Sequence, residues 1–148
     1  MTASTTPLGH TSVPRTYVID PDWVRSFRRA IPTLAEKSAS PADRAIPLTF
    51  PIVLQPNPIP GLNLPESGVI HGEQRFHYCT PLRLGETVTV VAEVSSYKER
   101  GGTVFATLIT RGMHADGTAA FEAQALLLYP VSDTPRSPAT PPDSDGAP

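Results

Sequence analysis

The stretch Gly68–Lys98, GVIHGEQRFHYCTPLRLGETVTVVAEVSSYK, decides the fold of this chain. Two runs in which apolar and polar residues alternate flank a turn built from Pro81 and Gly85. Side chains on a β-strand point to opposite faces at every second residue, so such alternation is typical of strands. The stretch therefore predicts strands over residues 69–78 and 86–97, paired as the first two strands of an antiparallel sheet.

The first of these runs carries the best candidates for chemistry. His71 and Glu73 fall two residues apart on one predicted strand face, as does His77. An imidazole can give or take a proton near neutral pH, and a carboxylate can orient it or act as a base. Gly72, between them, is a residue type that often marks close approach by a ligand or another backbone. These features predict His71 as an acid–base group and Glu73 as its helper.

Each of these residues also has a structural interpretation. His71 could be hydrogen-bonded at a dimer interface or to the loop Pro56–Pro65, and Glu73 could be a surface carboxylate paired with Arg75. His77 is expected to face solvent or a cross-strand partner, and His114 is expected in a turn beside Asp116-Gly117.

Composition narrows the class of protein. A chain of 148 residues suits a single domain with one core, and a net charge of −2 without a basic stripe argues against nucleic-acid binding. The single cysteine, Cys79, excludes an internal disulfide, and the scattered histidines have no metal-ligand spacing. No apolar run approaches the length of a membrane span. We therefore expect a cytoplasmic protein without a metal or another cofactor.

The folded domain is expected to occupy residues 15–130. Residues 1–14 are rich in Thr, Ser, Pro and Gly, and residues 131–148 are rich in Pro, Ser and Asp. Such segments bury too little apolar surface to offset the entropy of ordering them, so both are predicted to be disordered tails.

The secondary-structure elements outside Gly68–Lys98 are predicted from capping residues, apolar runs and turn residues. Residues 15–19 form a short strand, and Asp20-Pro21 is a helix N-cap followed by proline at the first helical position. Residues 45–55 are apolar nearly all round, which predicts a short buried helix starting near Pro51. Two further strands, at 103–113 and 119–129, are joined to their neighbours by glycine turns. The sum is an α+β domain in which a curved antiparallel sheet of meandering strands wraps around a central helix.

Three motifs within this order resemble the MaoC-like dehydratase group of the hot-dog fold, in particular its N-terminal or non-catalytic-half type. The first covers the opening strand and helix over residues 17–31, and the second is the segment Ile46-Pro47-Leu48-Thr49-Phe50 at the start of the central helix. The third is the most specific: His71-Gly72-Glu73-Gln74-x-Phe76-x-Tyr78 followed by Pro81-Leu82-Arg83-x-Gly85-Glu86. The resemblance extends over about residues 17–128.

This resemblance implies an activity on thioesters of coenzyme A or acyl carrier protein. Members of the group add water to an enoyl thioester or remove it from a 3-hydroxyacyl thioester. The fully active type carries an Asp-x-x-x-x-His pair in the loop before the central helix, as a general acid and base. The corresponding loop here, residues 31–45, contains Glu36 and Asp43 but no histidine.

Three functions remain open at this point. The chain could be a catalytically silent, acyl-binding partner of a second hot-dog chain that supplies the catalytic loop. It could be a hydro-lyase in its own right, with His71 and Glu73 as catalytic residues and a backbone N–H at the start of the central helix polarising the thioester carbonyl. It could be a thioesterase, since one fold hosts several reactions. The resemblance implies a homodimer or heterodimer, and substrate contacts from Thr49, Phe50, Gly72 and Gln74.

Overall fold

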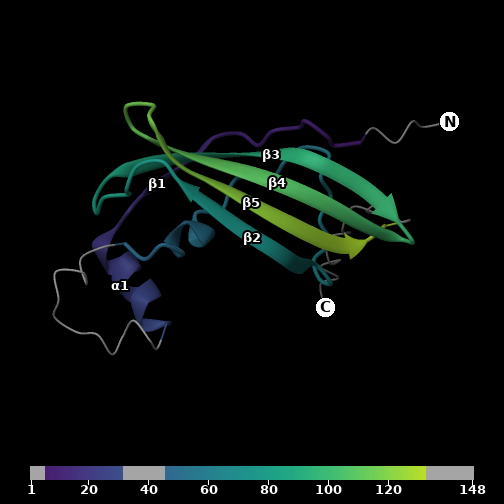
Figure 1. The fold of residues 1–148 in the computed structure, drawn as a ribbon, viewed down its shortest axis with the longest axis horizontal. Coiled ribbons are helices and arrows are strands. Elements are labelled where there is room, and N and C mark those ends of the chain that lie inside the picture. Colours follow the sequence, from purple (N-terminus) through teal and green to yellow (C-terminus); the bar gives the residue numbers. More distant parts are fainter. Residues whose placement is uncertain (1–5, 32–45, 133–148) are drawn as a thin grey trace, which may run out of the picture.

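A computed structural model describes residues 6–31 and 46–132 of the chain. One α-helix, one turn of 3-10 helix and five strands make up this part (Figure 1). In chain order they are β1 (Arg15–Val18), α1 (Pro21–Arg29), η2 (Phe50–Val53), β2 (Ile70–Tyr78), β3 (Thr87–Arg100), β4 (Thr103–His114) and β5 (Ala119–Pro130). The predicted strands are thus confirmed, with ends that move by up to a few residues.

The five strands form one antiparallel sheet in the order β1-β3-β4-β5-β2. The glycine turns at Gly101-Gly102 and Gly117 join β3, β4 and β5 as consecutive hairpins. The predicted pairing of the two strands in Gly68–Lys98 is wrong, because β2 pairs with β5 instead, with Phe76 opposite Ala123. The segment between β2 and β3 therefore crosses the end of the sheet, and β2 is left as an edge strand (Figure 1).

Helix α1 begins as the sequence predicts. The Asp20 carboxylate accepts hydrogen bonds from the backbone N–H groups of Asp22 at 2.7 Å and Trp23 at 3.4 Å, which satisfies two donors that the first helical turn leaves free. Val24 on this helix is buried. The helix lies near one end of the long strands, on the left of Figure 1.

The predicted central helix is a single 3-10 turn, η2. Proline lacks an N–H and clashes with a preceding turn, and the closely spaced Pro47, Pro51 and Pro56 leave too few regular positions for an α-helix. The N–H groups of Phe50, Ile52 and Leu54 donate to carbonyls within the same segment. These three N–H groups are therefore already used within the segment, and the polarising role predicted for a backbone N–H at this helix start stays a prediction.

The core lies on one face of the sheet, in clusters that follow the strands. The largest is covered by α1 and η2; its buried members are Ile19, Val24, Phe50, Leu54, Val88, Val90, Ala120, Phe121 and Ala123. Two smaller clusters are closed by the loop that contains Ile59 and Leu62. An irregular loop thus covers this part of the sheet.

The N-terminal segment lies along β3, beyond the end of β1 (Figure 1). Gly9 N–H donates to the Val94 carbonyl at 2.8 Å, and the buried Ser12 accepts a 2.9 Å bond from Ala92 N–H through its hydroxyl. The predicted tail 1–14 therefore contains residues that extend the sheet, since pairing with an open strand edge holds even a polar segment. Residues 1–5 and the predicted tail from residue 133 lie outside the described residues. Within the described ranges, no helix is long and apolar enough to cross a membrane.

Candidate functional site

The predicted acid–base residues lie on the exposed edge strand β2 and are bonded to different partners. The His71 Nε2 atom lies 2.9 Å from Gln74 Oε1, and the Glu73 carboxylate is paired with the Arg75 guanidinium. The interpretation of Glu73 as a surface carboxylate paired with Arg75 is therefore confirmed. The catalytic role of His71 and Glu73 stays a prediction.

Gly72 lies at a β-bulge between His71 and Glu73, where the register with β5 shifts. A Cβ atom at this position would lie 2.8 Å from Leu128 Cδ1. The glycine predicted close approach by a ligand or another backbone. In the structure it is the Leu128 side chain of β5 that lies close to Gly72. A larger residue here would require the Leu128 side chain to shift.

Two of the predicted substrate-binding residues lie on η2 and differ in exposure. Thr49 is exposed at the start of the turn. Phe50 is completely buried, with its ring centroid 5.1 Å from that of Trp23 and 5.4 Å from that of Phe27. Gln74 is half-buried on β2. The substrate contacts predicted for Thr49, Phe50, Gly72 and Gln74 stay predictions, and Phe50 has a packing role besides.

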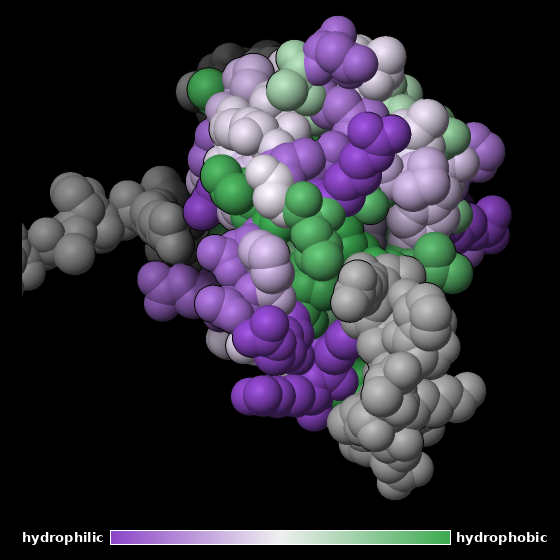
Figure 2. Space-filling model, turned by 90° about the vertical axis from the view of Figure 1, so that its left-hand side faces the viewer, coloured by the Kyte–Doolittle hydropathy of each residue, from purple (hydrophilic) through white to green (hydrophobic). Residues whose placement is uncertain are grey.

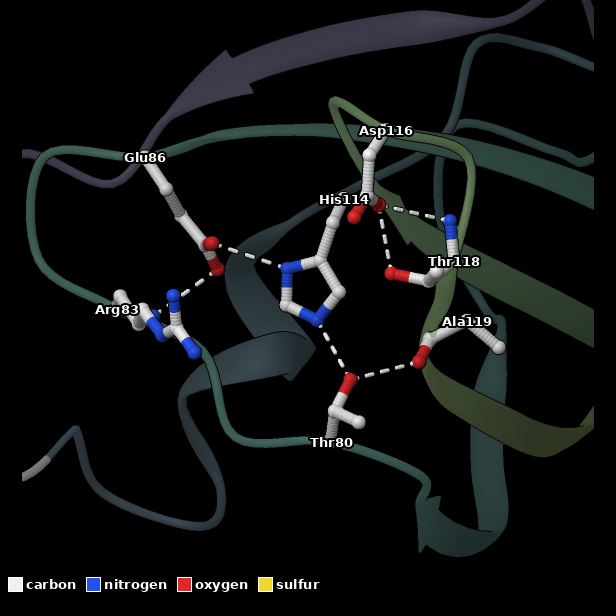
Figure 3. A network of polar contacts seen from close by, with 7 residues as sticks. All are labelled: Thr80, Arg83, Glu86, His114, Asp116, Thr118 and Ala119. Atoms are coloured by element: carbon white, nitrogen blue, oxygen red, sulfur yellow. Dashed lines mark hydrogen bonds and ion pairs between the residues drawn. The ribbon is translucent and has the colours of Figure 1, made fainter.

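A second group of polar side chains joins three segments at the end of the sheet (Figure 3). His114, at the end of β4, lies between Glu86 and Thr80: its Nδ1 atom is 2.9 Å from Glu86 Oε2, and its Nε2 atom is 2.6 Å from Thr80 Oγ1. The His114 and Glu86 side chains are only 14% and 19% exposed, whereas the partners in the Arg111–Glu93 and Arg111–Glu122 ion pairs are all at least 37% exposed. Glu86 Oε1 also accepts a bond from Arg83 N–H.

The hydrogen bonds of Thr80 argue against nucleophilic catalysis by this group. Glu86, His114 and Thr80 are joined in the order carboxylate, imidazole and hydroxyl, which is the order of an acyl-transfer triad. The Thr80 hydroxyl, however, also donates to the Ala119 carbonyl at 2.8 Å. A hydroxyl has one proton, so while Thr80 donates to Ala119 it accepts from His114 and is not being activated by it. The described geometry is that of a link between the β2–β3 segment, β4 and β5.

A shallow hollow of about 380 Å³ lies beside this link. It is lined by Thr80, Pro81, Arg83, Glu86, His114, Ala115, Asp116 and Thr118. Bonds from the Thr118 hydroxyl and backbone N–H hold the pKa of the Asp116 carboxyl below its usual value. Within residues 6–31 and 46–132, no group of three or more His, Cys, Asp or Glu side chains could hold a metal ion.

The sequence prediction missed His114 because it treated the residue as part of a turn. In the structure β4 continues through His114, which lies opposite Val88 of β3. The alternation of Val104, Ala106 and Leu108 continues to position 114 by even steps. Extending that pattern would have placed His114 on the inward face of the sheet.

Replacing Thr80 with valine tests whether this link stabilises the fold. The change removes the hydroxyl that contacts both His114 and the Ala119 carbonyl, so we expect the free energy of unfolding to fall by about 1 kcal/mol. Urea denaturation gives the value. The matched control is Thr118→Val, whose hydroxyl contacts only Asp116, two residues away. An equal loss in both variants would contradict a specific linking role for Thr80.

The fold has counterparts among solved structures. The five-stranded antiparallel sheet with one α-helix matches the hot-dog fold of MaoC-like dehydratases in solved structures. The C-terminally truncated HadBC (3R-hydroxyacyl-ACP dehydratase) complex from Mycobacterium tuberculosis aligns with a TM-score of 0.63 at 20% identity, over 85% of this chain and 99% of that one. The (R)-hydratase from A. caviae aligns with a TM-score of 0.56 at 23% identity, over 86% and 100%.

The family itself follows from sequence comparison. Residues 7–123 match the family described as "FAS1-like, dehydratase domain region", and the chain belongs to this family. A UPF0336 protein of Clavibacter michiganensis subsp. michiganensis is 30% identical over 131 residues, which cover 79% of this chain and 88% of that protein. The resemblance to MaoC-like dehydratases that the sequence motifs suggested is therefore confirmed.

Proposed function

We propose that this chain is one subunit of a two-chain hydro-lyase that acts on 3-hydroxyacyl or enoyl thioesters, and that the second chain supplies the acid–base pair. The observation that carries the proposal is the separation of the chain's own candidates. His71 bonds Gln74 and Glu73 bonds Arg75, so the two are not joined as an acid–base unit. The loop at 31–45, where the family's active type has Asp-x-x-x-x-His, contains no histidine.

The open edge of β2 is where we propose that the second chain binds. An edge strand presents unpaired backbone N–H and C=O groups to any strand that can lie alongside it. Val69 and Ile70, at the start of this edge, are 36% and 63% exposed. Two of the similar structures are two-chain complexes by name: HadBC, and ChsH1-ChsH2 from Mycobacterium tuberculosis.

The division of roles follows from the chemistry of dehydration. A base removes the proton at C2 of the acyl group while an acid protonates the departing hydroxyl at C3. The partner's Asp and His perform these two steps, and the present chain holds the acyl part of the coenzyme A or carrier-protein thioester. A homodimer that uses His71 and Glu73 is the alternative arrangement.

Hydration of crotonyl-coenzyme A distinguishes these arrangements. The full chain is assayed alone and together with a hot-dog chain of the same genome that carries the Asp-x-x-x-x-His loop. We expect the pair to exceed the chain alone by at least about 100-fold, the lower range for a lost acid–base group. In the pair, His71→Ala and Glu73→Gln are expected to change the rate by less than about threefold.

Two results would contradict the two-chain proposal. Full activity of the chain alone, lost in His71→Ala, would assign the reaction to this chain. Release of free thiol from an acyl-coenzyme A by the chain alone, without hydration, would indicate a thioesterase.

A further inference from the structure

Tyr78, the last residue of β2, has a buried hydroxyl group without a hydrogen-bond partner among the described residues. Buried polar groups in folded proteins nearly always have a partner, and an exception calls for an explanation in function or in a bound group. The other tyrosine that packs against the same core cluster, Tyr17, follows the rule: its hydroxyl donates to the Gln55 carbonyl at 2.6 Å. Of the two tyrosines packed against this cluster, Tyr78 is therefore the one whose hydroxyl has no hydrogen-bond partner among the described residues.

The surroundings of Tyr78 are apolar. Its ring lies 6.1 Å from that of Phe76, and both pack against the main core cluster together with Ile46, Val53 and Leu82. Figure 2 views the end of the molecule at which α1 lies and shows apolar side chains gathered near its centre, flanked by polar ones. Among the apolar residues of the η2 segment, Leu48 and Ile52 are 72% and 38% exposed. Ile46 and Val53, which flank these two residues in the sequence, pack against the same core cluster as Tyr78.

The Tyr78 hydroxyl is neutral at physiological pH, as tyrosine hydroxyls ordinarily are, and burial raises its pKa further from the physiological range. A neutral phenol in an apolar setting offers one proton to a neutral acceptor, whereas an anion would have to lose its hydration to reach it. The ligand that fits is an apolar chain with a carbonyl.

We propose that the Tyr78 hydroxyl donates a hydrogen bond to the thioester carbonyl of a bound acyl group whose alkyl chain lies on the apolar surface beside η2. This inference rests on the proposed function and specifies which residue of this chain holds the substrate's reactive end. A hydrogen bond to the carbonyl oxygen also favours the enolate that forms when the C2 proton leaves.

The first test compares Tyr78→Phe with the matched control Tyr17→Phe in urea unfolding of the full chain. Removing an unpartnered buried hydroxyl is neutral or stabilising, whereas removing a partnered one is destabilising. We expect the unfolding midpoint of Tyr78→Phe to equal or exceed that of the wild type, and the midpoint of Tyr17→Phe to fall. A fall of the same size in both would show that Tyr78 has a partner within the chain and would overturn the inference.

The second test measures binding of two compounds to the full chain. One is S-decanoyl-N-acetylcysteamine, and the other is its thioether analogue S-decyl-N-acetylcysteamine, which lacks the thioester carbonyl. We expect the wild type and Tyr17→Phe to prefer the thioester by about 3- to 10-fold, the value of one hydrogen bond, and Tyr78→Phe to bind both equally. If Tyr78→Phe still prefers the thioester over the thioether, the role of Tyr78 is contradicted, whereas binding of the acyl chain by this protein is not. If the wild type binds neither compound, acyl binding by this chain fails as well.

Discussion

Replacing Phe50 with alanine is expected to lower the free energy of unfolding by about 3–5 kcal/mol, which is a large part of the stability of a small domain. Phe50 is completely buried, and its ring meets Trp23 and Phe27 of α1 edge-on, at interplanar angles of 71° and 89°. Its loss would leave a cavity that the proline-bounded η2 cannot close by shifting. Urea denaturation followed by tryptophan fluorescence reports the change, because Trp23 lines the cavity.

Ile52 provides the control for Phe50. It belongs to the same turn but is 38% exposed, so Ile52→Ala is expected to cost about 1 kcal/mol. Equal losses in the two variants would mean that Phe50 does not join η2 to α1. In that case the large cluster beneath these elements would need another explanation.

Replacing Gly112 with alanine is expected to have the second-largest effect on stability. Gly112 of β4 lies opposite Phe121 of β5, and an added Cβ would overlap three carbon atoms of the Phe121 ring, the farthest of them at 2.7 Å. Phe121 is only 2% exposed and cannot swing into solvent. Overpacking of this kind costs about 1–3 kcal/mol or more, measured as the difference in free energy of unfolding.

A double variant distinguishes this clash from a general intolerance of β4 to substitution. Phe121→Leu shortens the side chain that the new methyl group meets. Gly112→Ala with Phe121→Leu should therefore be more stable than the sum of the two single changes predicts, by about 0.5–3 kcal/mol. Strict additivity would contradict the contact.

The strands could be predicted from the sequence because each has its own local signal. The alternation of Val88, Val90, Ala92 and Val94 predicts a strand with one buried face, and all four residues are buried. The pairing of β2 could not be predicted in the same way. Alternation defines a strand but not its neighbour, and β2 pairs with β5 across a large sequence separation.

The short buried helix near Pro51 was predicted at its place, but the sequence did not indicate that it is a 3-10 helix of four residues. An apolar segment with proline at both ends is compatible with a buried helix or with a buried irregular segment, and periodicity does not separate them. The number of backbone N–H donors does separate them, because Pro47, Pro51 and Pro56 each lack the N–H that an α-helix would use. What remains is one 3-10 turn, in which the N–H groups of Phe50 and Ile52 donate to nearby carbonyls.

The candidate site was only partly predictable. The residue types on β2 were found from sequence, but the alternation of residues did not indicate the bulge between His71 and Glu73. The link from Glu86 through His114 to Thr80 joins residues up to 34 positions apart, and no short motif connects them. That the buried Tyr78 hydroxyl has no hydrogen-bond partner among the described residues depends on how the side chains pack. Composition and residue spacing therefore could not predict it.

The most direct test of the proposed function uses the reconstituted pair with the aspartate of the second chain's Asp-x-x-x-x-His loop replaced by asparagine. The measurement is the rate of crotonyl-coenzyme A hydration by this pair, beside the pair in which only His71 of the present chain is changed to alanine. The two-chain account predicts a loss of at least about 100-fold in the first pair and near-normal activity in the second. The reverse pattern, activity that survives the Asp→Asn change but is lost in His71→Ala, would contradict it.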